Sequence, residues 1–234
     1  MPVIAISSPK GGAGKTTAAT LLASELAVRG TTVTVIDADP NKNVVDWAKL
    51  GSLPETLEVI GDVDEESITD CIEAAAQASA FVIIDLEGTA SLMVSYAIAM
   101  ADLVIIPVQG SQLDAKQAAR QIKLIRSQER VTRRKIPFAV LVTRTNPAIM
   151  PKTLRHIEAS FAEHGVPVFG VRLFDREAYR ALFSFGGTLE GLGDKGVSNL
   201  AAAITNARAY VAEVLRTLRA SGTAAKADAA SEVA

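Results

Sequence analysis

The chain contains a single cysteine, Cys71, among its 234 residues. One cysteine excludes an internal disulfide and any metal site built from several thiolates, and it is typical of a reducing compartment. The sequence also lacks an apolar run of the roughly 18 to 20 residues that a membrane-spanning helix needs. No basic segment precedes the first apolar run, which therefore indicates a buried strand rather than a signal peptide. These absences predict a soluble, cytoplasmic protein.

The net charge is also close to zero, because the chain has 24 Lys and Arg residues and 26 Asp and Glu residues, which gives a formal net charge of −2. Such a balance argues against a generally basic nucleic-acid binder, but the charges are unevenly distributed. Residues 1–120 hold 7 basic and 16 acidic residues, a net of −9, whereas residues 121–180 hold 12 and 5, a net of +7. Residues 181–234 hold 5 of each. The asymmetry indicates an anionic partner for the second half of the chain.

Short apolar runs rich in β-branched residues alternate with helical patterns along the chain. The runs are almost continuously apolar, as strands covered on both faces must be. They lie at 3–8, 32–37, 81–85, 103–107 and 138–142, with weaker candidates at 57–60 and 168–173. Helical patterns occupy 14–29, 64–78, 91–99, 112–128 and 151–164. This alternation predicts an α/β fold, a doubly wound and mostly parallel sheet with helices on both faces.

A last helix is predicted at about 198–220, with apolar residues spaced so that one face packs on the sheet. Residues 221–234 contain Val233 as their only large apolar residue, which predicts a disordered tail. No internal repeat or linker interrupts the preceding segment. We therefore expect one domain over residues 1–220.

The strongest motif follows the first strand and opens the first helix. Its residues are Lys10, Gly11, Gly12, Ala13, Gly14, Lys15, Thr16 and Thr17. Glycines let successive backbone N–H groups point at phosphate oxygens, and the helix N-terminus adds a partial positive charge. Lys15 can reach the β- and γ-phosphates, and the Thr16 hydroxyl can ligate Mg²⁺. The motif predicts a phosphate-binding loop.

The loop departs from the usual pattern G-x-x-x-x-G-K-[ST], because Pro9 stands where the first glycine falls and Lys10 precedes two glycines. In this it resembles the deviant Walker A loop, K-G-G-x-G-K-T-[ST], of the ParA/MinD class of P-loop ATPases, here in a short form. The resemblance implies ATP and Mg²⁺ as cofactors and an ATP-dependent homodimer. It also implies that Lys10 reaches across the dimer to the partner's phosphates and neutralises charge on the transferring phosphoryl group.

Three aspartates follow strands of the predicted sheet. Strand periodicity places Asp37 and Asp39 on one side at a carboxyl end, where open α/β sheets bind ligands. Asp85 ends the apolar run at 81–85 in the Walker B pattern, from which it can hold a Mg²⁺-bound water. The resemblance implies that Asp39 orients or deprotonates the attacking water and that Asp37 contacts the Mg²⁺ shell. Glu87, which departs from the family pattern, either contacts that shell or faces solvent.

Later segments match the family more loosely. Asp114 is a plausible cap for the helix that begins near residue 112. By resemblance, the segment 143–145 lies where the family contacts the nucleotide base. The segment 172–179 resembles the part of the family fold near the adenine and the dimer face.

Basic residues gather in three places outside the phosphate loop. These are Arg130, Arg133, Arg134 and Lys135 before a strand, Lys152 and Arg155 on one helix, and Arg216 and Arg219 on the last helix. Non-specific DNA binding needs several such cations and no base-reading motif. We expect Lys152, Arg155, Arg216 and Arg219 to contact DNA. No segment ahead of Val3 could hold the helix-turn-helix module of longer family members, so operator recognition is not expected.

The resemblance thus predicts a slow ATPase switch, stimulated by a ParB-like or other cargo-bound activator, that binds DNA non-specifically and is associated with the nucleoid. Plasmids, chromosomes, transferred DNA and protein clusters are all carried by related proteins, so several cargoes stay open. A membrane-cycling ATPase like MinD is the alternative. The tail beyond residue 220 lacks the bulky apolar residues of a membrane-binding helix, which argues against stable membrane association. An iron–sulfur electron carrier of the same superfamily needs more than one cysteine per subunit.

Overall fold

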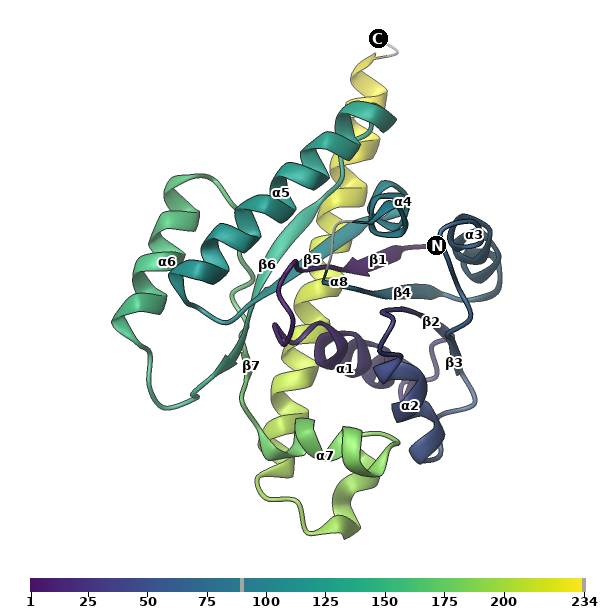
Figure 1. Ribbon diagram of the computed structural model, residues 1–234, viewed down its shortest axis with the longest axis vertical. Helices are drawn as coiled ribbons and strands as arrows, with labels where there is room; N and C mark the ends of the chain where they lie inside the picture. Colours follow the sequence, from purple (N-terminus) through teal and green to yellow (C-terminus); the bar gives the residue numbers. More distant parts are fainter. Residues whose placement is uncertain (89–90, 233–234) are drawn as a thin grey trace.

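A single parallel sheet of seven strands forms the centre of the protein (Figure 1). The computed structural model describes residues 1–88 and 91–232, with side chains described to residue 222. The strand order is β3-β2-β4-β1-β5-β6-β7, and every described pairing is parallel. The strands are β1 (Val3–Ile6), β2 (Val33–Ala38), β3 (Leu57–Ile60), β4 (Phe81–Leu86), β5 (Leu103–Val108), β6 (Phe138–Thr145) and β7 (Leu173–Phe174). The predicted α/β class and parallel sheet are confirmed.

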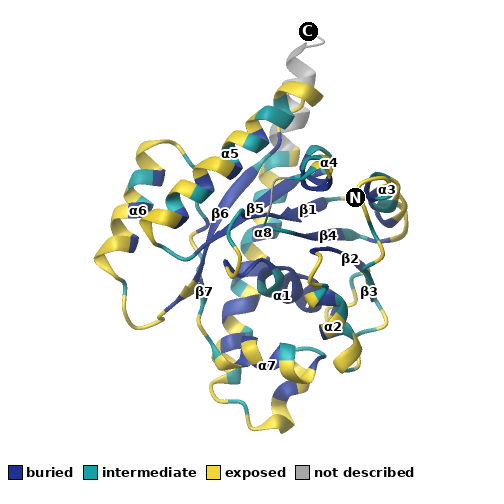
Figure 2. Ribbon diagram, viewed as in Figure 1, coloured by how far each residue is buried: buried dark blue, intermediate teal, exposed yellow. Residues whose placement is uncertain are grey.

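Helices connect successive strands and cover both faces of the sheet, as parallel connections require. They are α1 (Lys15–Ala27), α2 (Asn43–Leu50), α3 (Ile68–Ala78), α4 (Leu92–Met100), α5 (Gln112–Thr132), α6 (Lys152–Glu163), α7 (Glu177–Phe185), a 3₁₀ helix η1 (Glu190–Lys195) and α8 (Leu200–Glu232). One apolar core joins the sheet to α1, α2, α7 and α8, and a second core joins its other face to α3, α4, α5 and α6. The strands are buried throughout most of their length, whereas the outer faces of α5 and α6 are exposed (Figure 2).

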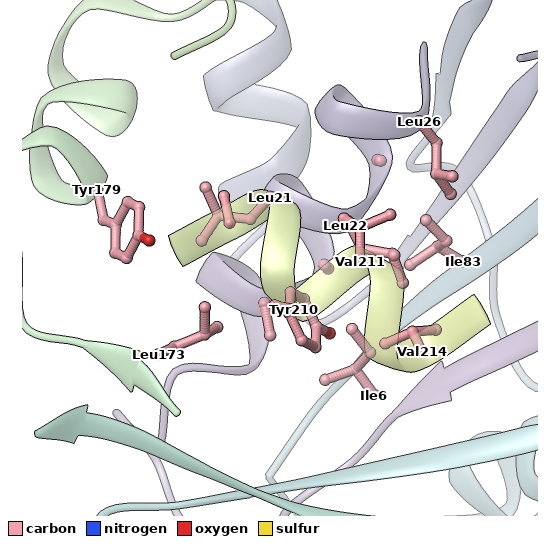
Figure 3. Close-up of a cluster of buried hydrophobic side chains, with 14 of the residues drawn as sticks. Ile6, Leu21, Leu22, Leu26, Ile83, Leu173, Tyr179, Tyr210, Val211 and Val214 are labelled. Carbon is pink, nitrogen blue, oxygen red and sulfur yellow. The ribbon is translucent and has the colours of Figure 1, made fainter. Parts of the chain in front are cut away.

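The core around α1 shows why its sequence forms a buried helix. Leu21 and Leu22 are fully buried and lie beside Tyr210 and Val211 of α8 (Figure 3). Ile6 of β1 completes this cluster from the sheet. Full burial of each such aliphatic side chain stabilises the fold by about 1.5–3 kcal/mol. The packing holds the N-terminus of α1 at the carboxyl ends of the central strands.

Several elements differ from the sequence expectations. Helices α2 and α7 and the 3₁₀ helix were not predicted, because each is short and flanked by glycine or proline. The last strand is only Leu173–Phe174, while Val168 forms an isolated bridge with Val140. The helix expected to end near residue 220 continues to Glu232, through the segment expected to be a disordered tail. That segment is rich in alanine, which has the highest intrinsic helix propensity. Residues 233–234 lie outside the described part.

The cap of α5 also differs from the prediction. Ser111 is the N-cap, and Asp114 stands three residues later. The Ser111 hydroxyl accepts a hydrogen bond from the Asp114 N–H, and the Asp114 carboxylate accepts one from the Ser111 N–H, which together form a capping box. None of the helices in the described ranges combines the length and apolar character needed to cross a bilayer.

Candidate active site

The loop between β1 and α1 is shaped by two glycines in left-handed conformation. Gly12 has φ +74° and Gly14 has φ +95°, a region that other residues rarely adopt. Gly14 immediately precedes Lys15, the first residue of α1, so the first-turn amides have no acceptor within the helix. The first turn of α1 carries no acidic residue. This end of the helix therefore presents donors and uncompensated positive charge, which suits a phosphate.

A buried threonine on β6 fixes the phosphate loop to the sheet. The Thr143 hydroxyl lies 2.6 Å from the carbonyl oxygen of Ala13 and 3.1 Å from that of Val108. A Cβ on Gly14 would lie 3.4 Å from the Thr143 side chain, so the close approach also favours glycine. Thr143, in the predicted segment 143–145, therefore contacts the phosphate loop directly and anchors it to β6.

An open cleft of about 460 Å³ lies over the loop. It is lined by residues of the phosphate loop, by the segment after β2, by the end of β4, and by Arg144 and Phe183. The predicted residues among its lining are Gly11, Gly12, Gly14, Lys15, Thr16, Thr17, Asp39 and Glu87. Ala13 is buried beneath them. Most of the loop and carboxylate residues predicted from sequence therefore converge on one cleft, and Glu87 lies at its wall, half-buried.

Lys15 is 6% exposed, and its ammonium makes no hydrogen bond or ion pair within the described residues. A Cβ on Gly88 would lie 3.6 Å from the Lys15 Nζ, so this lysine reaches the loop after β4. A buried ammonium without a partner is unfavourable. The position therefore suits an anion in the cleft.

The sheet register brings Asp37 and Asp85 side by side. These residues are direct partners on the neighbouring strands β2 and β4, and both are fully buried. Neither carboxylate oxygen of Asp85 has a hydrogen-bond partner within geometric limits among the described residues. Burial raises the pKa of Asp85 to about 7; nearby Thr16 and Lys15 oppose the shift, while Asp37 and Asp39 add to it. A buried carboxyl without partners marks a place for a cation and its water shell.

Asp37 and Asp39 have internal partners. One oxygen of Asp37 accepts hydrogen bonds from the N–H groups of Val44 at 2.9 Å and Val45 at 3.0 Å, which fixes the start of α2. Burial raises the pKa of Asp37, although these amides oppose the shift. Asp39 accepts hydrogen bonds at its Oδ1 from the backbone and side chain of Asn41, at 2.9 and 2.8 Å. Asp37 is therefore partly committed to structure, a role that sequence reasoning did not assign.

The residues fit a magnesium ion that is held mainly by phosphates and water. Within the described ranges, no three His, Cys, Asp or Glu side chains converge as a metal cluster. Mg²⁺ needs no such cluster, because it keeps several waters and takes only one or two protein oxygens beside substrate phosphates. Thr16 in the cleft and the unpartnered Asp85 supply donors of the required kind.

A second hollow of about 230 Å³ adjoins the phosphate cleft and shares Gly14, Thr17, Arg144 and Phe183 with it. Its remaining wall comes from β6, β7 and α7: Thr143, Leu173, Phe174, Asp175, Arg176, Tyr179 and Arg180. Both segments that the family resemblance associated with the base therefore meet here. Phe183 of the unpredicted α7 is an addition to them. The hollow has the mixed apolar and polar lining of a small-ligand site.

Lys10 lies apart from the other loop residues. It is absent from the described lining of the cleft, and its ammonium instead lies 2.8 Å from the Asp114 Oδ1 and 3.2 Å from the Gln109 Oε1. Gln109 belongs to the loop between β5 and α5, and Asp114 lies in the first turn of α5. The two lysines of the motif therefore differ in position: Lys15 lines the cleft, whereas Lys10 contacts Gln109 and Asp114.

The basic residues form separate groups on the surface. Lys152 and Arg155 are exposed on α6, whereas Arg216 and Arg219 are exposed on α8, and Figure 1 shows these helix segments well apart. Arg219 lines a hollow with Arg134 and Lys135 at the other end of the sheet. The Arg134 guanidinium donates to the carbonyls of Ala99 and Ala101 at the end of α4, so it also stabilises that helix terminus. One protomer does not bring the two predicted DNA-contacting pairs together.

Comparison with known proteins agrees with this geometry. Residues 1–219 match the family described as VirC1 protein. The chain belongs to the VirC1/ParA family. Protein ParA of Rhizobium radiobacter is 44% identical over 218 residues, which cover 93% of this chain and 98% of the relative. The chain is therefore a short member of the ParA/MinD class of P-loop ATPases, as its deviant loop indicated.

More distant members of the class share the fold. Maintenance of carboxysome distribution protein A from Halothiobacillus neapolitanus is 28% identical over 197 residues, which cover 83% of this chain and 89% of that relative. The apo structure of Cyanothece McdA covers 88% of this chain and 99% of its own, with a TM-score of 0.71 at 19% identity. The ATP complex of a McdA variant covers 88% and 96%, with a TM-score of 0.67 at 20% identity. At these identities the two structures support the fold alone.

Proposed function

We propose that this VirC1/ParA-family ATPase is a nucleotide-controlled switch that dimerises with ATP, binds DNA non-specifically and positions a cargo. In this scheme the nucleotide phosphates occupy the cleft over the loop, and the base occupies the adjoining hollow. Two protomers face each other through their clefts. Hydrolysis is slow in the isolated protein because the complete site forms only with the partner protomer and an activator.

The placement of Lys10 is the observation that carries this proposal. Lys15 enters the cleft of its own protomer, whereas Lys10 lies outside it and contacts Gln109 and the first turn of α5. A lysine that served its own nucleotide would line its own cleft. The arrangement supports a lysine available to the nucleotide of a second protomer, where it neutralises charge on the transferring phosphoryl group.

The other residues take roles that their positions allow. The amides of the loop and Lys15 bind the β- and γ-phosphates, and Thr16 with Asp85 holds Mg²⁺, in the case of Asp85 through water. Mg²⁺ supplies charge neutralisation at the phosphates when bound. Asp39 faces the cleft and orients or deprotonates the attacking water, and Asp37 keeps the Asp39 segment in register while it contacts the outer metal shell.

DNA binding is proposed to depend on the dimer. Each protomer offers Lys152 and Arg155 on α6 and Arg216 and Arg219 on α8. Dimerisation doubles the number of cations that meet the DNA backbone, and affinity rises steeply with the number of phosphates contacted. Binding by the monomer is correspondingly weak and salt-sensitive. The ATP dimer is then held on the nucleoid.

Release of the dimer is assigned to an activating partner carried by the cargo, of the ParB kind. The 44% identity to a protein named ParA favours DNA as the cargo. The relative named for carboxysome distribution keeps a protein cluster as the second possibility. Co-purification of the cargo with the ATP-bound protein distinguishes the two.

Light scattering of the purified protein with Mg-ATP, Mg-ADP and no nucleotide tests the switch. Wild type should dimerise only with Mg-ATP, and Lys10→Ala should bind nucleotide but remain monomeric. Lys49→Ala, at an exposed lysine of α2, is the matched control and should dimerise normally. Equal dimerisation of Lys10→Ala and wild type would refute the trans role.

DNA binding is measured in the same three nucleotide states. We expect retention on DNA only with Mg-ATP, and reduced retention in the double variants at Lys152/Arg155 and at Arg216/Arg219. Asp39→Ala should stay on DNA after ATP addition because hydrolysis fails. Equal DNA binding in all three nucleotide states would refute the switch. Normal phosphate release by Asp39→Ala would refute the proposed role of Asp39 in activating water.

A further inference from the structure

The base hollow, which is the hollow of about 230 Å³ beside the phosphate cleft, takes part of its wall from a very short strand. β7 contains only Leu173 and Phe174 and is the last strand in the sheet order, so no strand of the described ranges borders its outer edge. Its pairing with β6 also shifts register between Thr143 and Thr145. A two-residue edge strand is held weakly by its own ladder, so its position depends on further contacts.

Asn206 of α8 pairs with the outer edge of β7. Its Nδ2 donates a hydrogen bond of 2.8 Å to the carbonyl oxygen of Arg172, and its Oδ1 accepts one of 3.1 Å from the N–H of Phe174. These two backbone groups flank Leu173, so the side-chain amide pairs with them as a residue of a neighbouring parallel strand would. Asn206 is 7% exposed, and both hydrogen bonds are therefore largely protected from water.

The same amide oxygen also contacts Tyr179 of α7. The Tyr179 hydroxyl lies 3.1 Å from the Asn206 Oδ1 and 3.0 Å from the Ala203 carbonyl oxygen, and the side chain points toward α8 in Figure 3. Burial raises the pKa of Tyr179 above its ordinary value, so the hydroxyl stays protonated and remains a donor. Phe174 and Tyr179 both line the base hollow, whereas Asn206 is not part of its described lining. Asn206 therefore holds two wall residues of the hollow from outside it.

We propose that Asn206 is a positioning residue for nucleotide binding, which holds Phe174 and Tyr179 where they contact the base. This role rests on the proposed position of the base and does not depend on the dimer or on Lys10. Asparagine is suited to it because one amide supplies both the donor for the Arg172 carbonyl and the acceptor for the Phe174 N–H. An aliphatic side chain would leave both backbone groups without these partners in a buried place.

Comparison of Mg-ADP with Mg-pyrophosphate isolates the contribution of the nucleoside. Both ligands carry two phosphates, and neither forms the ATP dimer of the proposed switch, so titration calorimetry reports on one protomer. Wild type should bind Mg-ADP more tightly than Mg-pyrophosphate. Asn206→Ala should weaken Mg-ADP binding about threefold to tenfold, as expected for the loss of about one buried hydrogen bond, and should leave Mg-pyrophosphate binding unchanged. A residue with only a structural role would change both affinities together.

Glu213→Ala is the matched control on the same helix. Glu213 lies about two turns after Asn206 and accepts hydrogen bonds from the N–H groups of Gly170 at 2.6 Å and Val171 at 2.7 Å, just before β7. Neither of these two residues is part of the described lining of the base hollow. Glu213→Ala therefore also removes contacts between α8 and this segment, but it should leave the affinities for both ligands unchanged.

Asn206→Asp provides a second variant. Its carboxylate keeps an acceptor for the Phe174 N–H and the Tyr179 hydroxyl and loses only the donor to the Arg172 carbonyl. This variant should therefore lose less affinity for Mg-ADP than Asn206→Ala. Urea unfolding verifies that each variant is folded, and Asn206→Asp replaces the alanine variant if the latter does not fold.

A loss of affinity confined to Mg-ADP in Asn206→Ala supports the proposal. An equal loss for both ligands, or the same loss in Glu213→Ala, would overturn it. If wild type prefers Mg-ADP but Asn206→Ala keeps that preference in full, the role of Asn206 fails and the proposed position of the base stands. If wild type binds Mg-pyrophosphate as tightly as Mg-ADP, the proposed position of the base fails, and the role of Asn206 fails with it.

Discussion

Replacing Asp85 with asparagine should stabilise the nucleotide-free protein, and more strongly at pH 8 than at pH 5. Asp85 is fully buried at the end of β4, and neither of its oxygens has a hydrogen-bond partner within geometric limits among the described residues, although the nearby Thr16 opposes the rise of its pKa. Burial raises its pKa from 3.8 to about 7. Asparagine has a similar shape and carries no ionisable group, so it removes the penalty of burying a charge.

The size of the effect follows from the two pKa values. Between pH 3.8 and about 7 the unfolded chain ionises Asp85 while the folded chain keeps it protonated, so the folded state is progressively disfavoured as pH rises. Each pKa unit corresponds to about 1.4 kcal/mol. The penalty is therefore about 2 kcal/mol at pH 5 and about 4 kcal/mol at pH 8, above which it stays constant. The variant should regain these amounts.

Urea unfolding with EDTA and without nucleotide, at pH 5 and pH 8, measures the difference between variant and wild type. Titrating groups that do not interact with Asp85 contribute equally to both proteins and cancel; Asp37, Asp39 and Lys15 interact with it and add a smaller difference. Asp46→Asn, at a side chain that is 68% exposed, is the control and should change stability little at either pH. A gain that is equal at the two pH values, or a loss at pH 8, would refute the reasoning. With Mg-ATP the order should reverse, because only the ionised carboxylate supports the metal.

Three substitutions outside the charged groups test the packing that shapes the site. Gly186→Ala should lower the free energy of unfolding by more than about 2 kcal/mol, since φ is +69° and a Cβ would clash with the backbone nitrogen of Gly51; urea unfolding measures it. Thr143→Val removes the hydrogen bond to the Ala13 carbonyl and should weaken binding of a fluorescent ATP analogue severalfold, and unchanged affinity would contradict the anchoring role. Tyr210→Phe should raise the melting temperature, because it removes a buried hydroxyl that has no partner in the described structure; destabilisation would show a hidden partner.

The sequence predicted those parts of the site that depend on local pattern. The phosphate loop is recognisable because it requires glycine and lysine at fixed spacing. Asp37 and Asp85 each end an apolar run of the sequence, which places each of them at the end of a strand. Because all strands are parallel, residues that end neighbouring strands must meet at one edge of the sheet. The direct pairing of Asp37 with Asp85 is the geometric outcome of that rule.

The rest depends on contacts that no local pattern encodes. Thr143 and Ala13 are 130 residues apart, and Lys10 and Gln109 are 99 apart, yet each pair is in direct contact. Arg134 looked like a member of a solvent-facing basic cluster, but part of its guanidinium stabilises the end of α4. Such assignments require the tertiary structure, because a side chain's partner rather than its type decides whether it is available to a ligand.

The charges of the active site fall into two classes in the described state, and the division explains how nucleotide could control the protein. Lys10, Asp37 and Asp39 each have an internal partner, namely an ion pair, helix amides and an asparagine. Lys15 and Asp85 are buried with no hydrogen bond within geometric limits among the described residues, and only the attraction between their charges and the nearby Thr16 partly compensates them. The unpartnered pair raises the free energy of the empty site, and phosphate and metal would relieve that penalty directly. The partnered residues must instead change partners, which ties their release to later steps. In the scheme proposed above, Mg-ATP would therefore bind first, and dimerisation would follow once Lys10 leaves its internal partners.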